Sequence, residues 1–61
     1  MNIYKIAGFE ILEIVRENKL FEYYIKPYGK NDFLYAFGVL DKFTVDQLET
    51  LVSHGYFEDF E

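Results

Sequence analysis

The chain has no cysteine and only one histidine, His54, among its 61 residues. Neither disulfide bonds nor a zinc site built from these side chains can therefore stabilise it. A domain of this size buries only about 60% of the surface that its unfolded chain exposes, so it needs another source of stability. Six tyrosines and seven phenylalanines can supply a dense aromatic core. We expect a single domain over residues 1–61, and we expect it to form a homodimer.

The clearest predicted element is a helix that begins after Thr44. Thr44 and Gln47 have the spacing of a capping box, in which each side chain bonds the backbone of the other. The apolar residues that follow share one arc of the helix, and the polar residues occupy the opposite arc. Gly55 suits the left-handed residue that ends a helix. The pattern predicts an amphipathic helix over residues 45–54.

Two segments upstream are rich in aromatic and β-branched residues and predict strands, at residues 19–26 and 33–40. The sequence PYGKND between them is typical of a turn, so the two strands form an antiparallel hairpin. Residues 7–17 fit a strand or a helix, and we favour the strand because a third strand supports the hairpin. The predicted fold is α+β, a three-stranded antiparallel β-meander with a C-terminal α-helix on one face (βββα).

The stretch DFLYAFGVL has apolar residues on both faces when it is a strand, because successive side chains alternate across a sheet. Ala36 and Gly38 allow a helix to approach closely, so we expect the helix on their face. The other face, with Tyr35 and Phe37, would then be open to a partner, since large exposed apolar patches usually mark interfaces. Alternatively, residues 7–17 form a second helix that covers it.

The whole net charge of −5 lies in the C-terminal third. Residues 1–40 hold five acidic and five basic side chains, whereas residues 41–61 hold six acidic residues and one lysine. Such a field repels nucleic-acid phosphates and attracts basic surfaces, so we expect a basic protein partner and no direct nucleic acid. Only the two lysines of the KPYGK loop favour nucleic-acid binding. The predicted partner-binding residues are Asp46, Glu49, Glu58, Asp59 and Glu61 on an acidic surface, and Tyr35 and Phe37 on an apolar face.

No arrangement of residues predicts catalysis. Ser53 and His54 are neighbours in the predicted helix, so they cannot face each other as a dyad. Asp46 and Glu49 lie early in that helix, where acids complement the helix dipole. The four glycines are isolated from one another, which indicates no phosphate-binding loop. We expect a non-enzymatic protein with no cofactor and no metal.

The sequence also predicts no membrane contact. Its longest uncharged apolar run, residues 33–40, is far shorter than the ~20 residues of a spanning helix. The first residues, MNIYKIAGFE, lack the basic flank and long apolar region of a signal peptide. We therefore expect a cytoplasmic protein.

The stretch FGVLDKFTVDQLETLVSHGYFEDF and the abundance of Ile, Lys, Asn, Tyr and Phe resemble small acidic proteins encoded by phages and prophages of low-GC Gram-positive bacteria. Some of those proteins are inhibitors that block a host protein, among them DNA mimics and anti-CRISPR proteins. The resemblance is one of composition over the whole chain and assigns no functional residue. It implies an inhibitor of a host nucleic-acid-handling protein. The alternative is a structural or assembly component that uses an exposed aromatic sheet face or a sheet edge.

Overall fold

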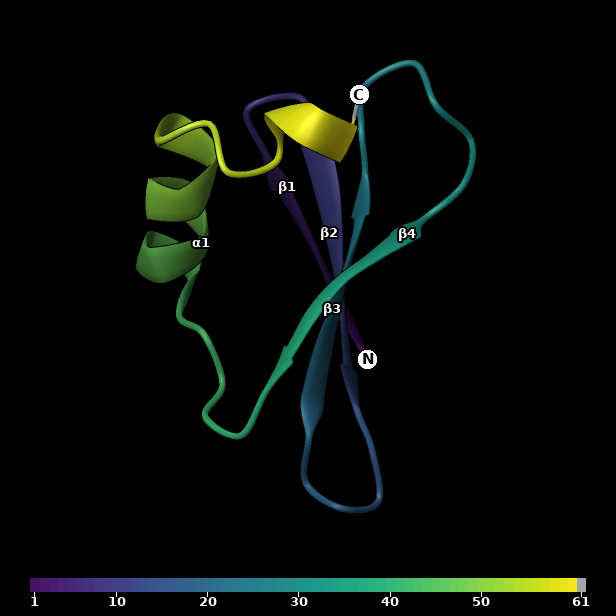
Figure 1. Cartoon of the computed structure of the whole chain (residues 1–61), viewed down its shortest axis with the longest axis vertical. Coiled ribbons are helices and arrows are strands. Elements are labelled where there is room, and N and C mark those ends of the chain that lie inside the picture. Colours follow the sequence, from purple (N-terminus) through teal and green to yellow (C-terminus); the bar gives the residue numbers. More distant parts are fainter. Residues whose placement is uncertain (61) are drawn as a thin grey trace.

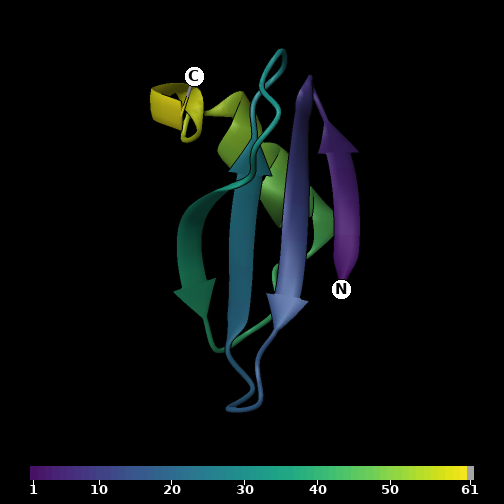
Figure 2. The ribbon, with the colours of Figure 1, turned by 90° about the vertical axis from the view of Figure 1, so that its right-hand side faces the viewer.

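Four antiparallel strands form one sheet, and a single α-helix packs on one of its faces (Figures 1 and 2). The computed structural model describes residues 1–60. The elements are β1 (Asn2–Ile6), β2 (Phe9–Val15), β3 (Phe21–Lys26), β4 (Leu34–Val39), α1 (Val45–Ser53) and the 3₁₀ helix η1 (Glu58–Phe60). The strands follow one another in chain order, so the sheet is a meander with β1 and β4 at its edges. The predicted α+β class and meander are confirmed.

The predicted number of strands is wrong, because β1 adds a fourth strand before β2. Ala7 and Gly8 join the two strands, with φ angles of 47° and 87°. Two consecutive residues with positive φ make the tight turn whose twist matches that of a β-hairpin. Ile6 and Phe9 pair directly across this turn. The segment 7–17, which also fitted a helix, therefore supplies a strand.

The core lies between the sheet and α1. Five apolar side chains there have at most 1% of their surface exposed: Ile11, Tyr23, Ile25, Leu48 and Phe57. The strand residues among them occupy alternate positions, as they must in order to reach the same face. Phe57 comes from the segment between α1 and η1, so the end of the chain completes the core.

Both ends of α1 agree with the sequence prediction. The Thr44 hydroxyl accepts a hydrogen bond from the Gln47 N–H at 3.1 Å, and the Gln47 side-chain oxygen accepts from the Thr44 N–H at 2.9 Å. This is the predicted capping box. At the other end Gly55 has a φ of 77°, and the Tyr56 N–H donates to the Leu51 carbonyl. A left-handed glycine with this bond is a common helix ending.

The prediction of which face of β4 the helix covers holds for Ala36, which packs against the core, but is wrong for Phe37 and Gly38. Consecutive residues of β3 pair with Phe37 and with Tyr35, which leaves Ala36 without a partner and makes a β-bulge. The extra residue breaks the alternation, so Phe37 packs against the core while Tyr35 lies on the opposite face. Gly38 lies on that face too. A Cβ atom there would lie 3.1 Å from the Tyr35 hydroxyl and 3.3 Å from Leu20.

Candidate functional site

An apolar band crosses the face of the sheet that α1 does not cover. Leu12 pairs with Ile3 on one side and with Tyr24 on the other, and Tyr24 pairs with Tyr35, so the four residues form one row across all four strands. The Tyr24 and Tyr35 rings meet edge to face, with centroids 5.5 Å apart. Ile3 and Tyr35 are 53% and 54% exposed. We call this row the outer band.

Two acids beside the outer band pair with basic side chains. The Lys26 ammonium lies 3.2 Å from the Glu10 carboxylate. Arg16 Nε donates to the Glu22 carboxylate at 2.7 Å, and the Tyr24 hydroxyl donates to the same oxygen at 3.0 Å. These hydrogen bonds, Arg16 first, hold the pKa of Glu22 below its usual value. Both of these acids are therefore paired, and Lys5, the cross-strand neighbour of Glu10, forms no ion pair in the described residues.

On the other side of the sheet, an open hollow lies between α1 and β4. Of the strands, β1 has the most contact with α1, which leaves the inner surface of β4 less covered. The hollow measures about 320 Å³ and has Phe37, Val39, Phe43, Leu51 and Tyr56 as its lining. All five side chains are apolar or aromatic, and the Phe37 ring contacts the rings of both Phe43 and Tyr56.

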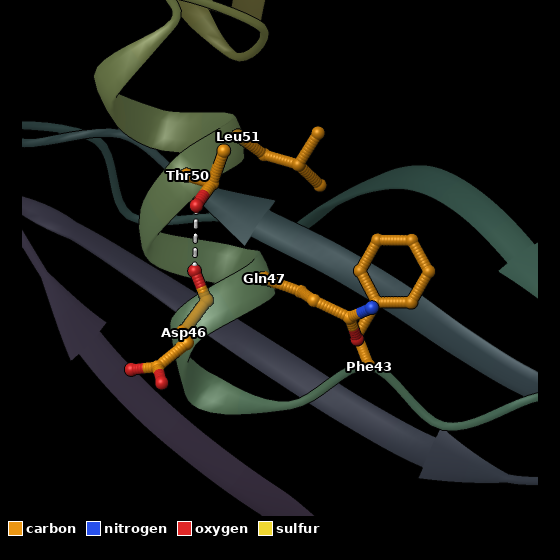
Figure 3. A pocket seen from close by; sticks show the side chains of 5 residues that line it. All are labelled: Phe43, Asp46, Gln47, Thr50 and Leu51. Atoms are coloured by element: carbon orange, nitrogen blue, oxygen red, sulfur yellow. Dashed lines mark hydrogen bonds between the residues drawn. The ribbon is translucent and has the colours of Figure 1, made fainter.

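A second hollow of about 340 Å³ adjoins the first. It is lined by Phe43, Asp46, Gln47, Thr50 and Leu51. Figure 3 shows that Gln47 and Leu51 point toward Phe43, whereas Asp46 and Thr50 lie on the side of α1 that faces away from Phe43. Phe43 and Leu51 belong to both hollows, so the two form one depression, which we call the groove. One part of the groove is apolar, and the other has a polar rim.

The structure does not gather the predicted acidic residues into a single cluster. Asp46 lies in the first turn of α1 and borders the groove, and Glu49 is exposed on the same helix. Glu58 and Asp59 lie in η1, beyond the other end of α1 (Figure 1). Glu61 lies outside the described residues. In the part of the chain that the structure describes, none of these acids forms an ion pair.

The two predicted apolar-face residues lie on opposite faces of the sheet. Phe37 is half-buried and lines the groove, whereas Tyr35 belongs to the outer band. The sequence analysis placed them together because it assumed strict alternation along β4. Phe43, Leu51 and Tyr56 were not singled out as groove residues, because they come together only when α1 packs beside β4.

A buried carboxylate, which the sequence analysis did not single out, lies on the inner face of β2. Glu13 is 1% exposed. It accepts hydrogen bonds from Tyr23 at 2.6 Å, Asn2 at 3.0 Å and Tyr4 at 3.2 Å, and the Lys42 ammonium lies 3.7 Å away. Burial alone would raise the pKa of Glu13. The three hydrogen bonds and the lysine charge outweigh burial, so its pKa is lowered.

The buried carboxylate is linked to the groove through Tyr23. The Tyr23 hydroxyl donates to Glu13 and accepts from the Phe43 N–H at 2.9 Å. Its ring also packs on the Phe43 ring, with centroids 5.6 Å apart. Burial and the bond to Glu13 raise the pKa of Tyr23 far above its usual value. Glu13 and Tyr23 together therefore fix the position of Phe43, the ring that both hollows share. The sequence did contain one signal for this link, because Glu13 and Tyr23 occupy inward-facing positions in apolar strands.

Metal-binding clusters and membrane-spanning helices are absent from residues 1–60. This range contains no group of three or more His, Asp or Glu side chains placed to hold a metal ion. Over the same range, no helix is both long and apolar enough to cross a membrane. Among the features described above, the groove, which Asp46 borders, is the strongest candidate for a functional site.

Comparisons with known proteins supply no relative from which a function could be inferred. No protein-family model, no curated protein and no solved structure matches this chain. The groove, the outer band and the distribution of charge are therefore the features from which a function can be inferred.

Proposed function

We propose that this chain is a small, non-enzymatic protein-binding protein that holds a basic partner at the groove. The observation that carries the proposal is the juxtaposition of an open apolar groove with Asp46, an acid on its rim that has no cationic partner in residues 1–60. Apolar contact supplies affinity, while complementary charge steers the encounter and selects the partner.

The charge of the segment that builds the groove favours a basic protein over a nucleic acid. Residues 41–60 hold five acidic side chains and a single lysine, Lys42. The Lys42 ammonium faces the carboxylate of Glu13 in the sheet. Its positive charge therefore partly offsets Glu13 as well as the acids of residues 41–60. The field around the groove is therefore negative, which repels phosphates and attracts lysine and arginine.

A narrower form of the proposal is an inhibitor of a host protein that handles nucleic acid. Such proteins have basic surfaces that receive phosphates, and an acidic surface with an apolar anchor can compete for them. The resemblance in composition to small phage and prophage proteins supports this form. The acids that would substitute for phosphates are Asp46, Glu49, Glu58, Asp59 and Glu61.

Affinity capture tests the proposal. The bait is the whole chain, beside a variant that carries amides at those five acids, in a lysate of a low-GC Gram-positive bacterium. We expect a basic, nucleic-acid-handling protein to be retained by the unmodified chain and lost with the variant. Its retention should also weaken as salt rises, because salt screens exposed charges. A partner that both baits hold equally would contradict the role of the acids.

The outer band favours a second candidate, a structural or assembly component. Its half-exposed residues Ile3 and Tyr35 lie on the two edge strands, β1 and β4. One side of the molecule therefore presents apolar surface together with strand edges. The predicted homodimer would use this face. Sedimentation equilibrium of the unmodified chain and of Tyr35→Lys tests it: a dimer that the substitution dissociates supports the candidate, and a monomer in both removes it.

A further inference from the structure

We infer that the groove recognises a partner segment that presents one bulky apolar side chain beside a lysine or arginine. This inference rests on the proposed function and specifies its ligand. The apolar hollow would take the bulky side chain, and the hollow bordered by Asp46 would take the cation. The two sites adjoin because Phe43 and Leu51 line both.

The lining of the apolar hollow, which is shallow and open to solvent, suits a single anchoring side chain. Its volume of about 320 Å³ lies at the lower end of the roughly 300–1,000 Å³ of small-molecule pockets. Its aromatic walls hold one another in place, since the Phe37 ring lies 5.2 Å from Phe43 and 5.8 Å from Tyr56. Such pre-formed apolar sites receive the aromatic and aliphatic anchors that dominate protein interfaces.

The adjoining hollow has one acceptor available to a cation. The Thr50 hydroxyl donates to the Asp46 carbonyl, and the Gln47 side-chain oxygen accepts from the backbone at the start of α1. The Asp46 carboxylate takes part in no ion pair within residues 1–60.

Charge disfavours a dimer in which the grooves of two copies face each other. Two copies that met groove to groove would bring two C-terminal segments together, each with an excess of acidic residues. Like charges at such close range oppose association. A partner segment with basic residues would instead neutralise this excess.

An NMR titration of the ¹⁵N-labelled whole chain tests the inference with three blocked peptides. They are Lys-Arg-Phe-Arg-Lys, the same peptide with alanine for phenylalanine, and Glu-Glu-Phe-Glu-Glu. We expect only the first to shift the backbone signals of Phe37, Phe43, Leu51 and Tyr56. Equal shifts with the alanine peptide would overturn the apolar anchor, and equal shifts with the acidic peptide would overturn the cation site. Absence of any shift at millimolar peptide would overturn both.

Matched substitutions on one helix sharpen the test. Asp46→Asn should weaken the first peptide about two- to five-fold at low salt, the range expected for one exposed ion pair. Glu49→Gln removes the same charge from the same helix but not from the groove lining, and should leave affinity within error. Equal weakening by both would show that only net charge matters. Thermal melting of each variant checks that the fold is intact.

The result of the peptide titration can be distinguished from the result of the affinity capture that tests the proposed function. If the peptides fail but affinity capture still yields a basic protein that needs the five acids, the recognition of a paired apolar and basic side chain is wrong and the protein-binding function stands. If the peptides bind as expected and capture yields no acid-dependent protein, the groove chemistry is right and the proposed function is wrong.

Discussion

The two sides of this molecule carry their charges in different ways. On the outer face Glu10 pairs with Lys26, and Glu22 pairs with Arg16. On the groove side, the acids of α1 and η1 form no ion pairs in the described chain, and Lys42 lies beside the buried Glu13. The acids Glu10 and Glu22 of the outer face are thus paired with cations, whereas the acids of α1 and η1 are not.

This difference shows where a partner has most to contribute. A partner that covered the outer face would have to break or bury ion pairs that are already formed, at a cost in desolvation. A basic partner at the groove would instead find unpaired acids beside open apolar side chains. Both sides expose apolar surface, so apolar surface alone does not distinguish them. What distinguishes them is whether their acidic side chains are already paired with cations.

The largest expected effect comes from Glu13, the buried acid of β2. Glu13→Ala removes the acceptor of three hydrogen bonds and leaves the Tyr23 hydroxyl without its carboxylate. Breaking a buried network of this kind costs about 3–5 kcal/mol in the free energy of unfolding. Urea unfolding followed by circular dichroism measures it.

Glu10→Ala is the matched control, because Glu10 lies on the same strand but on the outer face. Its ion pair with Lys26 is near the surface, so we expect a loss of at most about 1 kcal/mol. Similar losses for the two substitutions would contradict the distinction between the buried acid and the outer pairs.

A smaller effect should appear on acidification. The pKa of Glu13 is lowered in the folded state, so its contribution to stability is present above the ordinary carboxyl pKa of 4.5. That contribution is lost as the pH falls through the lower, folded-state pKa. We expect the urea midpoint to decline below pH 4.5, and to decline less in Glu13→Gln.

The pKa of Glu22 is lowered too, but this carboxylate lies at the surface, where solvent screens its ion pair. Glu22→Gln should therefore leave most of the acid-dependent decline in place. If Glu22→Gln flattened the decline and Glu13→Gln did not, the acid sensitivity would belong to the outer face.

The smallest effect is expected for Lys26→Met, which breaks an outer ion pair. Lys26 also lies over the Phe33 ring, at 5.2 Å from its centroid, so the change removes two weak contacts. The loss in the free energy of unfolding should not exceed about 1 kcal/mol. Partner capture at the groove should be unchanged. Loss of capture would place the binding surface on the outer face instead.

The features that the sequence predicted correctly are those with local signals. Thr44, Gln47 and Gly55 mark the ends of α1 because capping bonds join residues only a few positions apart. The α+β class and the meander followed from the short, turn-separated apolar segments. The acidity of the C-terminal third was also visible in the sequence, as it depends on composition alone.

The features that were missed depend on contacts between distant segments. The Ala36 bulge has no signal in LYAFGV, because apolar residues on both faces hide a change of phase. β1 follows from a turn at Ala7 and Gly8, and a positive φ at alanine is not what its residue type indicates. Glu13 looks like a surface residue until Tyr23 is placed opposite it. The groove depends on all of these at once.

The most direct test of the central claim compares two double variants as baits for partner capture. One, Asp46→Asn with Glu49→Gln, removes two unpaired charges from α1. The other, Glu10→Gln with Glu22→Gln, removes two paired charges from the outer face. The account predicts that the first bait retains measurably less of the partner than the unmodified chain at low salt, whereas the second bait retains as much. Loss with the second bait and retention with the first would contradict it.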